Sequence, residues 1–192
     1  LHGKNHPQDR PTYDGTDAAA ISEYIRENQL VAFEKLCGDD RKSRAIVTMP
    51  GMAQFRTTRR IDGDYTLTVR DVFRHFSDSV GAICDMDQRD YLYEIPYRCL
   101  VRSGYPNLIT AGRSISAEGY AWDVARVIPP AIITGQVAGL AASISLDSTR
   151  DLTTIDIKTL QEKLTAQNVL LHFDDSWVPD NPEPYSENID HI

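Results

Sequence analysis

Apolar residues recur at roughly helical intervals in the first part of the chain. Thr16 or Asp17 can cap the first turn of this stretch, and Gly38 follows its last turn. The apolar positions are Ile21, Tyr24, Ile25, Leu30, Phe33 and Leu36. This pattern predicts a helix from Asp17 to Cys37.

Shorter apolar runs follow, separated by turn residues. Ala45–Met49 and Gln54–Ile61 are typical of short strands, with Pro-Gly and Asp-Gly as the turns after them. Thr68 can cap a short helix over the next eight residues. The segment Tyr91–Leu100 is predicted to be extended, with an interruption at Pro96.

The second half contains longer helical patterns. Asn107–Thr110 is predicted to be a short buried strand, and Val169–Phe173 a last strand. A helix is predicted from Pro129 to Leu146, because proline suits a first helical turn. A further helix is predicted within Asp151–Asn168, with two leucines on one face.

The helix that begins at the two prolines carries a stripe of small residues. Gly135, Ala138, Gly139 and Ala142 fall at i, i+3, i+4 and i+7, so this face permits close approach of a sheet or a flat ligand. Spacing alone favours packing over ligand binding. The uncharged stretch Val127–Leu146 is diluted by proline and polar residues, which favours a buried helix over a membrane span.

Composition narrows the class of protein. The chain has 192 residues, 41% hydrophobic and 25% charged, which is typical of one globular domain. Its net charge of −8 argues against a nucleic-acid partner. The first residue is Leu1 rather than Met, so we expect the native start to lie upstream.

The cysteine and histidine residues form no metal-binding motif in the sequence. We expect the three cysteines to be buried free thiols, and His2 and His6 to lie in a loop. His75 is expected on the surface without an obvious partner. The cysteines are Cys37, Cys84 and Cys99. The sequence therefore predicts no metal site. It also contains no GxGxxG, GxxxxGK[ST], HExxH or GxSxG motif.

Three blocks, in order, resemble the FAD-dependent oxidoreductase family. RTTRRIDGDYTLT (Arg56–Thr68) resembles R-x-x-R-R-[IL]-x-G-x-Y-x-L, and YEIPYRCLV (Tyr93–Val101) resembles Y-x-I-P-Y-R-x-L. NLITAGRSISAEGYAWDVARVIPPAIITGQVAGLAA (107–142) resembles the C-terminal signature N-L-[LIV]-x-A-G-R-x-I-S, R-V-x-P and G-x-A-A-G. Together the blocks cover about Arg56 to Ala142.

The resemblance implies a cofactor site. It places Ala111, Gly112 and Arg113 along the ribityl and pyrophosphate region of FAD. It aims the start of the proline-initiated helix, at Val127, Ile128 and Pro129, toward the pyrimidine edge of the flavin, where helix N–H groups suit developing negative charge. Gln136 follows within two turns, with packing as its other role.

The resemblance also implies substrate-side residues. Arg59 or Arg60 would pair with a substrate carboxylate or the flavin, and Arg126 would face the flavin. The alternatives are salt bridges for the first two, to Asp62, Asp64 or Glu94, and a turn cap for Arg126. Tyr65 and Tyr97 are candidate acids, although a role in the core is the commoner one.

We therefore interpret the chain as the C-terminal part of an FAD-dependent oxidoreductase, inactive alone because its N-terminal Rossmann half is missing. The alternative is a non-catalytic binding or structural module. The predicted fold is mixed α+β: a strand and helix of a Rossmann-like FAD domain, plus an antiparallel-strand and helix region on the substrate side. The predicted divisions are 1–16 (irregular), 17–104 (substrate side), 105–172 (FAD domain) and 173–192 (acidic tail).

The expected partners are the missing half and an unidentified small-molecule substrate. We also expect the chain to associate with itself, and to bind neither nucleic acid nor a membrane. Substrate and compartment stay open.

Overall fold

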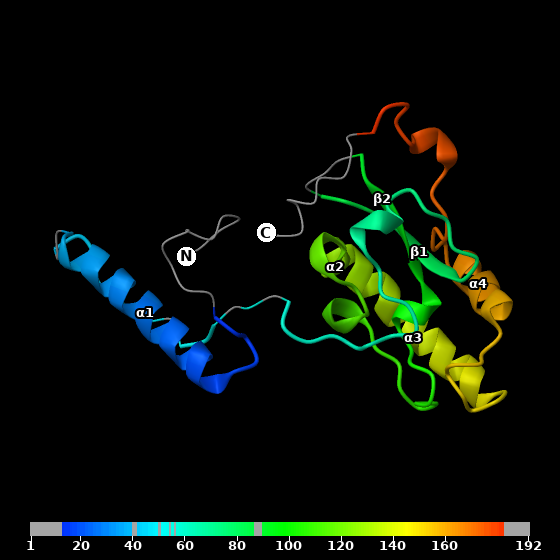
Figure 1. Ribbon diagram of the computed structural model, residues 1–192, viewed down its shortest axis with the longest axis horizontal. Helices are drawn as coiled ribbons and strands as arrows, with labels where there is room; N and C mark the ends of the chain where they lie inside the picture. Colours follow the sequence, from blue (N-terminus) through cyan, green and yellow to red (C-terminus); the bar gives the residue numbers. More distant parts are fainter. Residues whose placement is uncertain are drawn as a thin grey trace. The chain divides into compact units, whose positions relative to one another are not determined.

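The computed structural model describes residues 13–39, 42–49, 51–53, 55, 57–86 and 90–182. Within these ranges the chain forms two compact units, which divide between Arg59 and Arg60 (Figure 1). The first unit contains one helix, and the second contains a small sheet with several helices. The mixed α+β class predicted from the sequence is confirmed.

Helix α1, Ala18–Cys37, forms the first unit together with the chain around it. The Asp17 carboxylate accepts a hydrogen bond from the Ala19 N–H at 3.0 Å, and Gly38 is the C-cap, as the sequence predicted. None of the helix residues is buried. The ring of Tyr24 contacts that of Phe55, with 4.9 Å between centroids.

Two predicted strands near the unit boundary are wrong. Ala45–Met49 has no regular structure, and the Val47 side chain is 95% exposed. Of Gln54–Ile61, positions 54 and 56 lie outside the described residues, and the other positions are irregular. A short apolar run becomes a strand only when a neighbour takes up its N–H and C=O groups, and no such pairing forms over the described part of either run.

The sheet of the second unit has two antiparallel strands, β1 Ser79–Cys84 and β2 Leu92–Pro96. Ala82 pairs with Glu94 and Cys84 with Leu92. The sequence indicated β2 but not β1. The extended segment predicted to reach Leu100 stops at Pro96, because a 3₁₀ turn covers the next three residues.

Helices surround this hairpin in the second unit (Figure 1). They comprise α2 Gly119–Ala125, α3 Ile128–Leu146 and α4 Ile157–Ala166, with 3₁₀ turns η1 Val69–Asp71, η2 Tyr97–Cys99, η3 Gly112–Ser114 and η4 Asp175–Trp177. The structure confirms the cap at Thr68, which forms a capping box with Asp71, but the predicted eight-residue helix is only the three-residue turn η1. It also confirms α3 and α4, whereas α2 was not predicted.

Two predicted strands of the second half do not form. Asn107 and Leu108 are exposed, and only a single bridge, between Ile109 and Val101, approaches strand pairing there. Val169–Phe173 is irregular, although the Leu170 carbonyl accepts the Ala82 N–H at 2.7 Å. This last segment therefore runs beside β1 without completing a ladder.

The core of the second unit lies between the hairpin and α3 and α4. Val80, Tyr93, Val137, Leu160 and Leu164 have no exposed surface. The helix α3 approaches β1 closely, because a Cβ added at Gly81 would lie 2.6 Å from Ile133. The inner face of α3 is thereby fixed against the sheet.

Helix α3 also has an apolar outer face. Among the described residues, it is the one helix long and apolar enough to cross a membrane by length and composition, with a mean hydropathy of 1.3. One third of that window is buried, and the core helix of a globular protein can meet the same criterion. The sequence-based rejection of a span stays a prediction.

Candidate functional site

The segment Ala111–Arg113 lies against the first turns of α3. The Gly112 N–H donates to the Thr134 hydroxyl at 2.9 Å, and that hydroxyl donates to the Pro130 carbonyl at 2.7 Å. Gly112 has φ +69°, a left-handed conformation that suits glycine. Two groups of residues predicted to bind cofactor, 111–113 and the start of α3, are thus neighbours.

The start of α3 offers fewer amide donors than the sequence analysis expected. The first turn of a helix has N–H groups without intrahelical partners, but Pro129 and Pro130 carry no N–H. The Ala131 N–H already bonds to the Val127 carbonyl at 3.2 Å. Val127 and Ile128 therefore supply the amide groups of this helix start, and Pro129 can contribute only apolar contact.

An apolar stripe runs along the outer face of α3, and we call it the α3 stripe. It consists of Ile128, Ile132, Gly135, Gly139 and Leu146. The three larger side chains are 64–73% exposed, and a Cβ at either glycine would meet nothing within 4 Å. A surface without side chains at its centre fits a flat ring or a second apolar surface, so the residues present are compatible with a flavin.

Two other predicted cofactor residues have partners within the chain. The Gln136 amide donates to Gln167 at 2.5 Å, which links α3 to the end of α4. The Arg113 side chain is exposed, and its backbone carbonyl accepts the Trp122 indole N–H at 2.8 Å. Gln136 thus has the packing role that the sequence left open, and cofactor contact by either residue stays a prediction.

Two of the predicted catalytic arginines, Arg60 and Arg126, have partners within the second unit. Arg60 donates to Ser116 at 3.1 Å and pairs with Glu118 at 3.4 Å. Arg126 forms an ion pair with Asp123 at 2.5 Å. Arg59 is exposed and belongs to the first unit, and Arg56 lies outside the described residues. Arg60 therefore has a salt bridge, as the alternative expected, but to another acid.

The two candidate tyrosine acids have structural partners. The Tyr65 hydroxyl donates to the Asp71 carboxylate at 2.6 Å, and burial together with this carboxylate raises the pKa of Tyr65 to about 12. The Tyr97 hydroxyl donates to the Leu152 carbonyl at 2.8 Å, and burial raises its pKa. Both hydroxyl groups therefore hydrogen-bond to acceptors within the chain, in keeping with the structural role that is commoner for such tyrosines.

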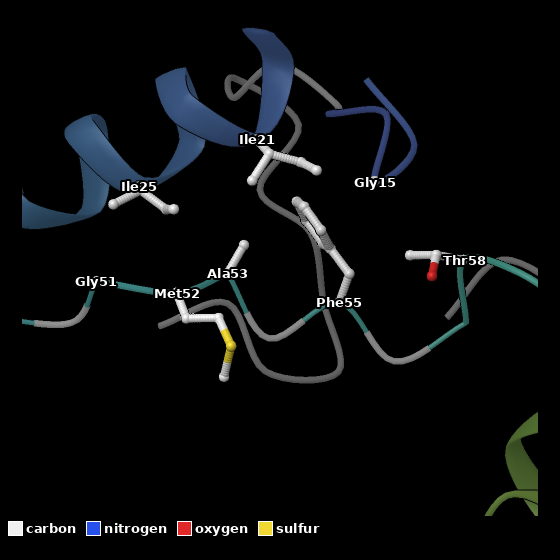
Figure 2. Close-up of a pocket in the computed structure, with 8 residues that line it drawn as sticks. All are labelled: Gly15, Ile21, Ile25, Gly51, Met52, Ala53, Phe55 and Thr58. Carbon is white, nitrogen blue, oxygen red and sulfur yellow. The ribbon is translucent and has the colours of Figure 1, made fainter. Parts of the chain in front are cut away.

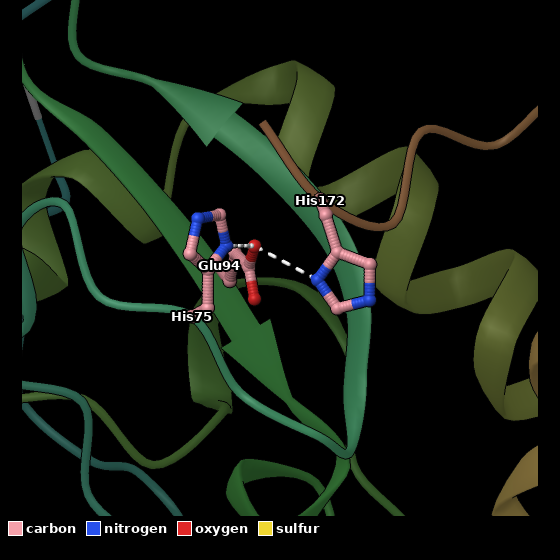
Figure 3. A group of neighbouring side chains, drawn as sticks. All are labelled: His75, Glu94 and His172. Atoms are coloured by element: carbon pink, nitrogen blue, oxygen red, sulfur yellow. Dashed lines mark hydrogen bonds and ion pairs between the residues drawn. The ribbon is translucent and has the colours of Figure 1, made fainter. Parts of the chain in front are cut away.

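A cluster that the sequence did not predict joins His75, Glu94 and His172 (Figure 3). His75 was expected to lack a partner, yet its Nδ1 lies 2.5 Å from Glu94 Oε1 and its Nε2 lies 2.9 Å from Asp175. The hydrogen bonds to Asp175 and Glu94 raise the pKa of His75. The residues are too far apart in sequence for any local spacing to reveal them.

The cysteines differ from one another. Cys99 is buried, and burial raises the pKa of its thiol, which makes it inert. Cys37 and Cys84 are exposed, so the expectation of three buried thiols is wrong for these two. Exposure follows from their positions at the last residue of α1 and of β1.

A shallow hollow lies within the first unit, between α1 and the segment that follows it (Figure 2). Ile21 and Ile25 point from α1 toward that segment. Its lining comprises Gly15, Ile21, Ile25, Gly51, Met52, Ala53, Phe55 and Thr58. None of these side chains is ionisable, so the hollow has the character of a packing surface rather than of a catalytic site.

Comparison of the sequence with known proteins identifies a family. The sequence profile described as FAD dependent oxidoreductase matches residues 22–164, which is most of the chain. No curated protein and no solved structure matches. The matched span contains the segment 111–113 and all of α3. The oxidoreductase and FAD assignments are thus confirmed at the level of the family: the chain belongs to the FAD dependent oxidoreductases.

Proposed function

We propose that this chain forms the flavin-ring and ribityl side of an FAD site, together with part of the substrate site. Ala111–Arg113 would run along the ribityl and pyrophosphate groups, and the start of α3 would face the pyrimidine edge. Bound FAD supplies two-electron hydride chemistry, whereas the protein positions and orients the reactants.

The observation that carries the proposal is the contact between Gly112 and α3 next to an uncovered face. The Gly112 N–H is held by Thr134, so the backbone at 111–113 is fixed close to the helix start. Beyond it, Gly135 and Gly139 leave the α3 stripe flat at its centre. A fixed backbone beside a flat apolar surface suits a ligand that has a polar chain attached to a planar ring.

The proposal assigns the other half of the cofactor site to residues outside these 192. A nucleotide diphosphate is held by a glycine-rich turn before a helix, and the sequence contains no GxGxxG. We therefore expect the chain alone to bind FAD weakly and to be inactive.

Arginines on the second unit would meet the substrate. The Glu118 side chain is 58% exposed, and an ion pair at the surface is weak, so Arg60 is available to a competing carboxylate. We propose that a substrate carboxylate competes with Glu118 for Arg60, and that Arg126 faces the flavin.

The test is a visible absorption spectrum, with added FAD, of the protein from the complete reading frame beside this chain. We expect flavin bands in the former alone. Gly139→Leu should weaken that binding at least tenfold, because it places a branched side chain in the α3 stripe. Ser22→Leu, at an exposed position of α1, is the matched control. A complete protein that binds no FAD would instead support the non-catalytic module.

The same exposed face predicts self-association of the isolated chain. Ile128, Ile132 and Leu146 are exposed together on α3, and the missing half would cover them. Sedimentation should show a weight-average mass that rises with concentration. A strictly monomeric chain at all concentrations would contradict this expectation.

A further inference from the structure

Three ligand-type atoms converge beside strand β2. The Nδ1 atoms of His75 and His172 lie 2.5 and 2.9 Å from the same oxygen, Oε1 of Glu94. All three donor atoms lie within 4.8 Å of one another. Both rings turn this nitrogen toward the carboxylate (Figure 3). Around a tetrahedral metal with bonds of about 2.0–2.2 Å, ligand atoms lie about 3.3 Å apart, so both nitrogen–oxygen distances would lengthen by less than about 1 Å on binding.

The Glu94 carboxylate has no exposed surface, although it is an ionisable group. Its second oxygen accepts the Phe76 N–H at 2.7 Å, so the carboxylate is held in one orientation. A buried carboxylate is costly unless a cation compensates its charge. The contacts to its first oxygen come from two imidazoles, and imidazole can present either a proton or a metal ion to it.

The surroundings of His75 match those of a metal-ligating histidine. Such a histidine commonly donates its other ring N–H to a carboxylate, which fixes the tautomer and orients the ring. The Nε2 of His75 lies 2.9 Å from the Asp175 carboxylate oxygen, and the imidazole ring stacks on the Phe173 ring with 4.2 Å between their centroids. Two residues before His75, Phe73 has φ +58°, a backbone conformation that residues other than glycine rarely adopt.

The cluster is also open to solvent on one side. The side chains of His75 and His172 are 41% and 47% exposed, so an ion can enter and can retain water as a further ligand. Two nitrogens and one carboxylate oxygen favour a divalent transition metal over Mg²⁺ or Ca²⁺, which prefer oxygen ligands.

We propose that His75, Glu94 and His172 bind a divalent transition-metal ion of the Zn²⁺ type, through Nδ1, Oε1 and Nδ1. The ion would join β2 to a segment 78 residues further along the chain, and would therefore fasten the C-terminal part of the second unit to its sheet. In the structure, both nitrogens lie within hydrogen-bond distance of Oε1. The proposal does not depend on flavin binding.

The first measurement is titration of the chelator-treated chain with Co²⁺, followed by visible absorption, and with Zn²⁺ by equilibrium dialysis. We expect one equivalent to bind, and Zn²⁺ to raise the midpoint of thermal unfolding. His172→Asn should lower the affinity at least about 100-fold. Asp175→Asn, at an 88% exposed side chain, should lower it about 10- to 100-fold and leave the metal-free fold unchanged.

The control is the double variant His2→Gln/His6→Gln, which removes two histidines outside the cluster. It should bind one equivalent with unchanged affinity. The proposal is overturned if binding is lost in this control but kept in His172→Asn, or if no stoichiometric binding occurs. It is equally overturned if Zn²⁺ shifts the unfolding midpoints of the wild type and His172→Asn by the same amount. The three residues would then form only hydrogen bonds with one another and bind no metal.

Discussion

Helices in the two units have the same kind of apolar spacing but differ in how far their residues are buried. Helix α1 in the first unit has apolar residues at helical spacing, yet none of its residues is buried. Helix α4 in the second unit is half as long, and it buries Leu160 and Leu164 completely. Spacing thus determines that a helix forms and which side is apolar, whereas burial requires a second layer to cover that side.

The family match covers parts of both units, so the difference in burial between their helices lies within one family. It begins at residue 22, within α1, and continues to 164, within α4, so both units are parts of one family architecture. Phe33 on α1 is 53% exposed and Ile132 on α3 is 64% exposed. Apolar faces left open in both units are consistent with our proposal that further protein residues complete the enzyme.

The largest difference in stability between the units is expected when a leucine in each is replaced by alanine. Leu160→Ala should lower the free energy of unfolding by about 2–5 kcal/mol, because it leaves a cavity in a closed core. Leu30→Ala, at a side chain 49% exposed, should cost about 1 kcal/mol or less. Urea unfolding measures both. Equal losses would mean that the first unit is packed as tightly as the second.

The next largest difference in stability between the units is expected from replacing a glycine in each with alanine. A Cβ at Gly63 would lie 2.8 Å from the Arg98 carbonyl oxygen, which is backbone and cannot move aside, so Gly63→Ala should cost about 1–3 kcal/mol. A Cβ at Gly51 would meet nothing within 4 Å, so Gly51→Ala should be neutral or slightly stabilising. The same unfolding curves provide the comparison, and a neutral Gly63→Ala would contradict the close packing described.

A smaller effect is expected from removing a hydroxyl. Tyr97→Phe deletes the bond to the Leu152 carbonyl in the core and leaves that carbonyl unpaired, which should cost about 1 kcal/mol. Tyr24→Phe keeps the ring contact with Phe55 in the first unit, so we expect little change in the midpoint of thermal unfolding. A larger loss at Tyr24 than at Tyr97 would reverse the comparison.

The smallest effect concerns the cap of α4. The Thr159 hydroxyl and the Lys158 N–H bond to Asp156 and lower its pKa from the ordinary value of 3.8. Its ionised form is therefore favoured in the folded chain, and the stabilisation is complete above that value and lost as the pH falls through the lowered pKa. Asp156→Ala should reduce the thermal midpoint at about pH 6 but not well below pH 3.8. A reduction that persists in acid would exclude this charge effect.

Local signals in the sequence predicted α1, α3 and α4, but they missed α2 and overestimated the length of the turn after Thr68. The caps at Asp17 and Thr68 and the proline pair at the start of α3 act within one turn, so they were readable without tertiary information. The short strands were predicted poorly. Ala45–Met49 and β1 are similar apolar runs, but only β1 has a partner strand, and pairing is a property of the folded chain.

The sequence by itself determined the family, because the family profile matches one contiguous stretch of it, residues 22–164. The cofactor site that we infer from that membership stays a prediction. Tertiary structure alone brought Gly112 to Thr134 and exposed the α3 stripe. It also assembled His75, Glu94 and His172, which are separated by 19 and 78 residues. Contacts over such distances depend on how the layers pack, and no periodicity along the chain encodes them.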